Sequence, residues 1–302
     1  MHTHQTLLRV AIVVASLSFP SLTIATSPDL GKTPQVLLLH RVDLPAGRVA
    51  DYAEKESEIV QAYQNAGIPV YWVTLQSVTG PPHFLYFDGY NAFEEVEAAG
   101  AAISKAAQSH PDLSRLQSEL MQFAQASQAS IHLRREDLSY RLDKFDITKF
   151  RYVRITIFQL RSGYEQDFAD ALRTFRKAYE ATGSESPWAV FQAHSGMPAP
   201  TFIAVQLLTS LKEFDDALEA RKYEHENPFD FGHSKPQLLP KDAILSMESN
   251  LYSVNLNISH LPIPNSARLS NPSMAGENLY PHAVERNPIS GNTIESYQQG
   301  RN

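Results

Sequence analysis

Two stretches of the chain decide the fold: residues 36–83, VLLLHRVDLPAGRVADYAEKESEIVQAYQNAGIPVYWVTLQSVTGPPH, and residues 152–199, YVRITIFQLRSGYEQDFADALRTFRKAYEATGSESPWAVFQAHSGMPA. Aligned without a gap at a separation of 116 residues, they share eleven identical positions. The identical pairs are Leu44/Leu160, Gly47/Gly163, Asp51/Asp167, Ala53/Ala169, Ala62/Ala178, Tyr63/Tyr179, Gly67/Gly183, Trp72/Trp188, Gln76/Gln192, Gly80/Gly196 and Pro82/Pro198. The two tryptophans of the chain coincide, so we expect one unit of about 115 residues to occur twice.

Each copy shows the same succession of hydrophobic patterns. Short β-rich runs predict strands at 36–42, 70–78 and 84–90 in the first copy and at 152–160, 188–194 and 202–208 in the second. Apolar residues at helical spacing predict helices at 45–66 and 92–108, from Phe168 to Tyr179, and at 211–226. We further expect a helix at about 112–133 and closing strands at about 138–145 and 250–257. The predicted order in each copy is therefore β-α-β-β-α-β, the ferredoxin-like pattern.

This order predicts an α+β fold made of two ferredoxin-like units, over residues 33–148 and 149–258, with antiparallel sheets packed face to face. Packing is expected because helices cover one face of each sheet and leave the other apolar face bare. On the duplication and the paired Gly and Trp positions, the chain resembles the dimeric α+β-barrel superfamily in a tandem, single-chain form. The resemblance implies a monomer with a pseudo-dimeric core and a small organic ligand against a sheet face.

The two ends of the chain differ from the repeats. Residues 1–25 contain Arg9, the apolar run 10–19 and small residues at Thr23 and Ala25, which is the layout of a secretory signal peptide. We therefore predict a periplasmic or extracellular protein; an uncleaved membrane anchor is the alternative. Residues 259–302 are rich in Pro and Asn and predict an extended or disordered tail, or else a strap held by Leu261 and other apolar residues.

Composition excludes several classes of function. The chain of 302 residues has no cysteine, which removes disulfide scaffolds, thiolate metal sites and cysteine nucleophiles. Its formal net charge of −7, without a large basic block, argues against nucleic acid as a partner. After the N-terminal segment, no run approaches the roughly 20 apolar residues of a membrane span.

Strand alternation predicts which side chains face the space between the two sheets. Assigning the apolar sets Leu37/Leu39 and Val153/Ile155/Ile157 to the helices leaves the alternate, more polar sets for the inter-sheet space. We expect His40 and His194 there as acid or base catalysts, because histidine titrates near neutrality. The ligand-binding residues predicted for the same space are Arg154, Trp72, Trp188, Gln76, Gln192, Tyr86 and Asp88.

Each of these residues can also have a purely structural role, and the sequence does not decide between the two. The tryptophans can be core anchors, the glutamines can satisfy strand edges, and His40 can be a hydrogen-bonded structural residue. Arg154 can pair with Asp88 or Glu165. A register error of one residue would exchange the two faces.

No cofactor and no metal site are predicted. Proteins similar to chlorite dismutases and dye-decolorising peroxidases bind haem, and the latter carry a Gly-x-x-Asp-Gly motif. The corresponding string here, residues 85–89 (LYFDG), lacks the first Gly, and His225 is the one plausible axial ligand. His225 and His233, with two glutamates, match no standard zinc spacing.

Two classes of function remain. The first is an exported small-molecule-binding protein or cofactor-independent enzyme of the α+β-barrel type, with its ligand between the sheets; the resemblance to that superfamily implies a monooxygenase-like or isomerase-like reaction. The alternative is a non-catalytic envelope protein with a structural or interaction role.

Overall fold

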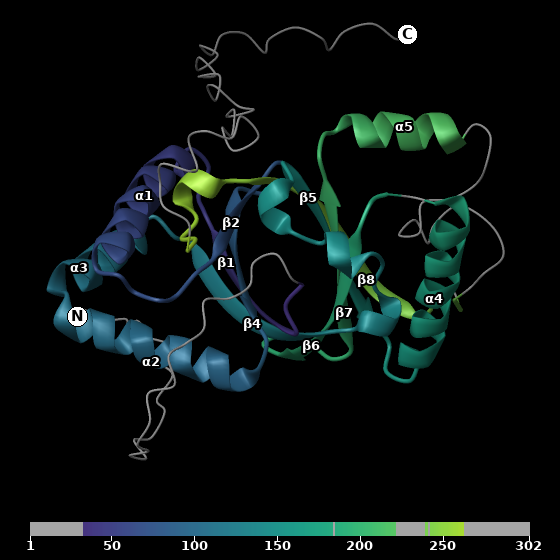
Figure 1. Ribbon diagram of the computed structural model, residues 1–302, viewed down its shortest axis with the longest axis horizontal. Helices are drawn as coiled ribbons and strands as arrows, with labels where there is room; N and C mark the ends of the chain where they lie inside the picture. The colour runs from purple at the N-terminus through teal and green to yellow at the C-terminus, as the bar shows by residue number, and fades with distance from the viewer. Residues whose placement is uncertain (1–32, 184, 222–238, 241, 263–302) are drawn as a thin grey trace, which may run out of the picture.

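Eight strands and five α-helices form the part of the chain that the computed structural model describes, residues 33–183, 185–221, 239–240 and 242–262 (Figure 1). The strands are β1 (Val36–Asp43), β2 (Val73–Ser77), β3 (His83–Tyr90), β4 (Ala126–Arg134), β5 (Tyr152–Leu160), β6 (Trp188–Ser195), β7 (Thr201–Leu208) and β8 (Ile244–Val254). The α-helices are α1 (Val49–Asn65), α2 (Phe93–Ser109), α3 (Pro111–Leu120), α4 (Glu165–Thr182) and α5 (Lys212–Arg221). Short 3-10 helices are η1 (Glu136–Leu138), η2 (Leu142–Lys144), η3 (Ile147–Lys149) and η4 (Leu256–Ile258).

The strands close into one barrel in the order β1-β3-β2-β8-β5-β7-β6-β4. All neighbouring strands are antiparallel. We call β1–β4 with α1–α3 the first half and β5–β8 with α4 and α5 the second half. The halves meet along two seams, β2 with β8 and β4 with β6, so their strands form one closed sheet. The predicted α+β class with antiparallel strands is confirmed.

The helices lie outside the barrel, with α1, α2 and α3 on the side of the first half and α4 and α5 on the side of the second (Figure 1). Three apolar clusters result. One fills the barrel with residues of both halves, among them Leu37, Phe87, Val153 and Phe191. The other two lie between the outer face of each half and its own helices. Both faces of the sheet are therefore buried over much of their area.

The predicted assignment of strand faces is wrong. Leu37, Leu39, Val153 and Ile155 line the inside of the barrel instead of contacting helices. The predicted inter-sheet residues therefore lie on the outer face: Trp72 and Tyr86 pack with α1, and Trp188 packs with α4. Alternation separates a strand into two sets but does not say which set points inward, and an enclosed barrel takes the more uniformly apolar set.

The predicted helix at 112–133 is confirmed only in its first part, and the predicted strand at 138–145 is wrong. Helix α3 ends at Leu120, strand β4 occupies Ala126–Arg134, and the segment after it forms η1 and η2. The first four residues of β4 are exposed and consist of Ala, Ser and Gln. Such residues lack the β-branched and aromatic character by which strands are identified from sequence. The second half agrees better, since β8 overlaps the predicted strand at 250–257 and then gives way to η4.

Helix α1 illustrates how the repeat encodes its local structure. Its buried residues are Tyr52, Glu56, Ile59, Val60 and Tyr63, which form one stripe along the helix. Gly67 follows the helix with φ 62°, a left-handed conformation that glycine adopts at low cost. Gly183 caps α4 in the same way, with φ 66°. The identity of these two glycines in the repeat therefore marks two equivalent helix ends.

After β4, the chain crosses from the first half to the second. Tyr140 exchanges two backbone hydrogen bonds with Trp188 at the start of β6, with N···O distances of 2.9 and 3.1 Å. The Ser139 hydroxyl accepts a hydrogen bond from the backbone N–H of Val190 at 2.9 Å. We call residues 135–140 the first crossover.

After β8, residues 255–260 cross back to the first half in the same manner, and we call them the second crossover. His260 pairs with Trp72 ahead of β2, with a Trp72 N–H to His260 C=O bond of 2.8 Å. The Ser259 hydroxyl accepts from the backbone N–H of Thr74 at 2.8 Å. Leu261, the residue that follows, is only 3% exposed. A tail that packs on the domain surface as a strap would bury this residue. The segment that follows the last strand of each half thus binds to the other half.

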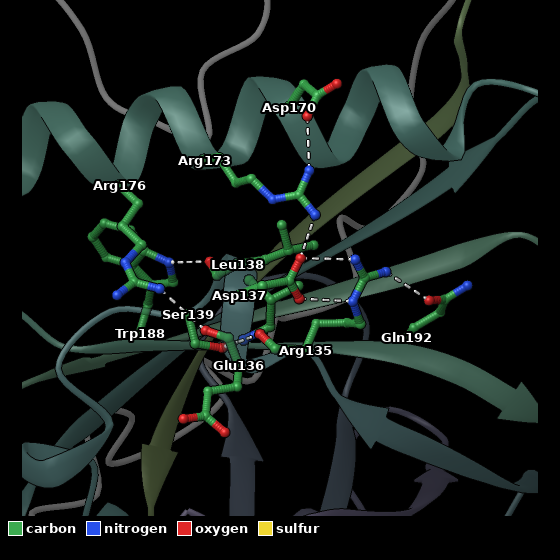
Figure 2. A network of polar contacts seen from close by, with 11 residues as sticks. Arg135, Glu136, Asp137, Leu138, Ser139, Asp170, Arg173, Arg176, Trp188 and Gln192 are labelled. Carbon is green, nitrogen blue, oxygen red and sulfur yellow. Dashed lines mark hydrogen bonds and ion pairs between the residues drawn. The ribbon is translucent and has the colours of Figure 1, made fainter.

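A polar network holds the first crossover against α4 and β6 (Figure 2). The Asp137 carboxylate accepts hydrogen bonds from Arg135 and from Arg173 of α4, and these two guanidinium groups hold the Asp137 pKa at about 2. Arg135 also donates to Gln192 Oε1 at 3.0 Å. In the second crossover, Asn255 donates to Gln76 Oε1 at 3.5 Å, so both glutamines of the repeat bind a crossover.

No helix within the described ranges has the length and apolar character that crossing a membrane would require. The predicted signal segment 1–25 and the tail from residue 263 onward lie outside the described residues. The predicted domain boundary between residues 148 and 149 falls inside η3, just ahead of β5.

Candidate functional site

The outer face of the first half carries a cluster of polar and ionisable side chains beneath its helices. Strands β1 and β3 contribute His40, Tyr86 and Asp88, since His40 lies opposite Tyr86 in the strand register. Helix α1 contributes Tyr52 and Glu56. We call these five residues, with Trp72, the outer-face cluster.

Tyr86 is the centre of a buried hydrogen-bond network. Its hydroxyl lies 2.6 Å from the Tyr52 hydroxyl and also hydrogen-bonds to the Glu56 carboxyl group. Glu56 is only 2% exposed, and burial raises its pKa from 4.5 to about 8. Burial likewise raises the pKa of both tyrosines. At pH 7 the network is therefore mostly protonated and uncharged.

Asp88 is the second acid of the cluster. The residue is half-buried, but its Oδ1 atom is completely buried and has no hydrogen-bond partner within the described residues. Burial raises its pKa from 3.8 to about 8. A buried carboxyl oxygen without a partner is rare in proteins and indicates a position where a bound molecule or water completes the hydrogen bonding. A strongly perturbed pKa beside such an atom is typical of functional sites.

His40 completes the ionisable set. Its Nε2 atom lies 2.6 Å from the Ser127 hydroxyl of β4, and its ring lies 5.6 Å from that of Tyr86. Burial lowers the His40 pKa below its ordinary 6.5. The imidazole is therefore neutral at pH 7 and able to accept a proton. A neutral base beside two protonated acids can move a proton without creating a buried net charge.

Trp72 contributes the largest aromatic side chain of the cluster. Its indole makes an edge contact with Tyr63 of α1, with ring centroids 5.2 Å apart, and lies 6.5 Å from Tyr86. The β2–β3 register pairs Val73 with Phe87, so extending it by one residue sets Trp72 opposite Asp88. Trp72 Nε1 is buried and, like Asp88 Oδ1, has no hydrogen-bond partner among the described residues.

Five of the predicted site residues lie elsewhere. Trp188 is 1% exposed and belongs to the apolar cluster of the second half. Gln76 and Gln192 bind the crossovers. His194 is exposed near the end of β6, with its ring 5.1 Å from that of Phe93.

Arg154, the remaining predicted ligand-binding residue, lies on the outer face of the second half. Its guanidinium carbon is 5.6 Å from the centre of the Phe214 ring of α5. In the strand register Arg154 lies opposite Gln206, as Leu38 lies opposite Asp88 in the first half. The structure therefore brings His40, Trp72, Tyr86 and Asp88 together and separates them from His194, Trp188 and Arg154.

Tyr52 and Glu56 are the two members of the outer-face cluster that are not predicted from the sequence. A signal was present, because Glu56 lies four residues after Tyr52 and three before Ile59, on the apolar stripe of α1. A carboxylate on a buried helical face needs either a partner or a proton. A charged residue within an apolar helical pattern is therefore a usable indicator of a site.

The histidine on which the haem alternative depends, His225, lies outside the described residues, as does His233. Among the residues that the structure describes, no group of three or more His, Cys, Asp or Glu could hold a metal ion.

Comparisons with known proteins give likenesses of structure only. No protein-family model matches the sequence, and no curated protein matches it. An anthrone oxidase-like protein shares 14% identity over 74% of this chain and 92% of its own, with a TM-score of 0.45. A protein of Fusobacterium nucleatum described as a monooxygenase shares 10% identity over 74% and 93%, with a TM-score of 0.47. A mutant chlorite dismutase from Candidatus Nitrospira defluvii shares 7% over 76% and 94%, with a TM-score of 0.43.

At such identities and scores these likenesses decide nothing about chemistry. The closed antiparallel order of the strands, with helices outside, is the feature that describes this chain. On its own strand order, the described part of the chain is an α+β barrel, in which eight antiparallel strands close on themselves and the helices lie outside.

Proposed function

We propose that the protein is a small-molecule enzyme that works by proton transfer at the outer-face cluster. The substrate is an uncharged organic compound with a carbonyl or phenolic oxygen. The observation that carries the proposal is the pairing of a neutral His40 with two carboxyl groups, Glu56 and Asp88, whose pKa values are raised to about 8. These groups are mostly uncharged at pH 7, so the site favours a neutral ligand.

The roles follow from the protonation states. His40 accepts a proton from a carbon next to the substrate carbonyl, and the electron pair moves to the carbonyl oxygen. Protonated Asp88 and Tyr86 then donate hydrogen bonds to that oxygen, as protonated carboxyl and tyrosine groups do in ketosteroid isomerase. Tyr52 and Glu56 hold the Tyr86 hydroxyl in place. Return of the proton to another carbon gives an isomer. If O₂ is the co-substrate, the enolate carbon forms a C–O bond to it, O₂ is reduced to the peroxide level, and the proton held by His40 completes a hydroperoxide.

This proposal moves the ligand from the predicted position between the sheets to the outer face. The inside of the barrel is filled by apolar side chains such as Leu37, Phe87, Val153 and Phe191. The outer-face cluster instead combines two unpartnered polar atoms with partly exposed residues, Leu38, His40 and Asp88.

From the sequence we also propose the wider setting. The two halves are copies of one ferredoxin-like unit, a monomer is the working form, and residues 1–25 direct export to the periplasm or beyond. The internal repeat and the layout of the N-terminal segment support these points.

The test uses 2-tetralone, a neutral aromatic ketone with acidic protons beside its carbonyl. Exchange of these protons in D₂O is followed by NMR. We expect the protein to accelerate exchange, and His40→Gln to lower the rate by about 100-fold or more. The rate should rise as His40 loses its proton below pH 6.5 and fall above about pH 8 as the acids ionise.

Thr156→Val is the matched control, since Thr156 lies opposite Ala204 in the second half as His40 lies opposite Tyr86 in the first. It should leave the exchange rate unchanged. Equal rates for the wild type and His40→Gln would refute the proposed role of His40.

A further inference from the structure

The two tryptophans of the repeat differ in one hydrogen bond. Trp188 Nε1 donates to the backbone carbonyl of Leu138 in the first crossover, at 3.1 Å, as Figure 2 shows. Trp72 Nε1 has no partner among the described residues, although the Trp72 side chain is only 8% exposed. Indole N–H groups usually find a partner when they are buried, so the difference needs a cause.

Thr74 supplies the cause. The crossovers are equivalent, because Ser139 and Ser259 each accept from a strand N–H of the opposite half, at Val190 and at Thr74. The carbonyl before Ser259, that of Ile258, therefore corresponds to the Leu138 carbonyl. In the first half this carbonyl accepts from the Thr74 hydroxyl at 2.7 Å. In the second half the position of Thr74 is taken by Val190, which has no hydroxyl to offer.

The strand register places the residue with the unpartnered indole N–H opposite the second unpartnered group of the cluster. Trp72 continues β2 opposite Asp88, and Asp88 Oδ1 is the other buried polar atom of the cluster without a partner in the described part of the chain. Side chains at opposite positions of neighbouring strands have Cβ atoms about 5 Å apart. A donor and a carboxyl group at this spacing can both reach one oxygen-bearing molecule.

We propose that Trp72 Nε1 is a substrate-binding donor, kept free for this purpose by the hydrogen bond between Thr74 and Ile258. The substrate oxygen that it binds belongs to an uncharged, planar carbonyl or phenolic compound, which packs against the aromatic rings of the cluster. This inference rests on the proposed function for the location of the site and adds the residue that determines which oxygen-bearing group is held.

The test follows the two indole N–H signals by NMR in the full chain labelled with ¹⁵N at tryptophan. Trp188→Phe assigns them, and 2-tetralone is the probe. In the wild type, we expect the Trp72 signal to move downfield as the probe binds and the Trp188 signal to stay in place. In Thr74→Val, the Ile258 carbonyl becomes available to Trp72. Its signal should then lie downfield without the probe, and the Kd for the probe should rise about tenfold.

Val190→Thr is the reciprocal control. It introduces a hydroxyl that competes for the Leu138 carbonyl, so the Trp188 signal should move upfield while the Kd for the probe stays the same. The inference is overturned if saturating 2-tetralone leaves the Trp72 signal unmoved, or if Thr74→Val binds the probe as tightly as the wild type. If the probe binds at Trp72 but its protons exchange no faster than in buffer, the proposed function fails and this inference stands. Accelerated exchange without a shift at Trp72 would uphold the proposed function and overturn the role of Trp72.

Discussion

The outer faces of the two halves share a framework and differ in chemistry. In the first half His40 lies opposite Tyr86, and Leu38 opposite Asp88. The same places in the second half hold Thr156 opposite Ala204 and Arg154 opposite Gln206. The first half thus has a base, a phenol and an acid where the second has a hydroxyl, a methyl group and an amide.

The difference teaches which positions the two halves share and which positions distinguish them. Residues that the copies share build the framework: Trp72 and Trp188 pack edge-on against Tyr63 and Tyr179, and Gln76 and Gln192 bind the crossovers. The ionisable groups of the cluster stand at positions where the copies differ. Shared positions therefore account for packing and for the crossovers, with Trp72 also in the cluster, while the ionisable groups of the cluster belong to the first half alone.

The largest effect that we expect concerns Glu56 and pH. Because the Glu56 pKa is about 8 in the folded chain and near 4.5 when exposed, the folded state binds the proton more tightly. Its contribution to stability is present at low pH and is lost as the pH rises from 4.5 to 8. Glu56→Gln removes the dependence of stability on the ionisation of residue 56. At pH 9 the variant should therefore have a free energy of unfolding several kcal/mol higher than that of the wild type.

Urea denaturation of both proteins between pH 4 and 9 measures this. Asp88 retains its own titration in the variant, so the pH dependence should weaken without vanishing. If the free energy of unfolding changes with pH in the same way in both proteins, Glu56 ionises normally in the folded state and the prediction is wrong.

A smaller effect separates the tryptophans. Trp188→Phe removes a fully buried indole and leaves the Leu138 carbonyl without its donor, so it should cost about 2–4 kcal/mol. Trp72→Phe loses packing but no hydrogen bond within the described residues, and should cost about 1–2 kcal/mol. Chemical denaturation at pH 7 compares them. A larger loss for Trp72→Phe would contradict the asymmetry.

The smallest difference should lie between the crossover serines. Ser139→Ala and Ser259→Ala each leave a buried backbone N–H without its acceptor, at about 1–3 kcal/mol. Because the two bonds are nearly equal in length, 2.9 and 2.8 Å, the losses should agree within about 0.5 kcal/mol. Unequal losses in denaturant titrations would mean that the crossovers are not energetically equivalent.

The sequence predicted the framework better than the site. Periodicity and the repeat located the core of every predicted strand except the one that closes the first half, because β4 begins with exposed Ala, Ser and Gln. Trp72, Tyr86, Asp88 and His40 were selected correctly as neighbours, but for the wrong face of the sheet. Alternation alone contains no information on which side of a closed barrel is the inside.

The remaining features depend on contacts between distant residues. The crossovers join residues as far apart as Thr74 and Ser259, and no local pattern signals such pairs. Glu56 acquires its raised pKa from burial on the face of α1 that packs against β3, and this burial becomes visible only when the strands and helices are assembled. The hydrogen bond from Thr74 to the Ile258 carbonyl, on which the proposed role of Trp72 depends, likewise joins residues that are 184 positions apart in the sequence.

The most direct test of the central claim, that the outer face of the first half holds its carboxyl groups protonated, is a ¹³C NMR titration of the side-chain carboxyl carbons. We expect Glu56 and Asp88 to titrate with midpoints near 8, while Asp137, between its two arginines, titrates near 2 in the same sample. Midpoints near 4 for both Glu56 and Asp88 would contradict the account, because the site would then carry two negative charges at neutral pH and could not donate protons to a substrate.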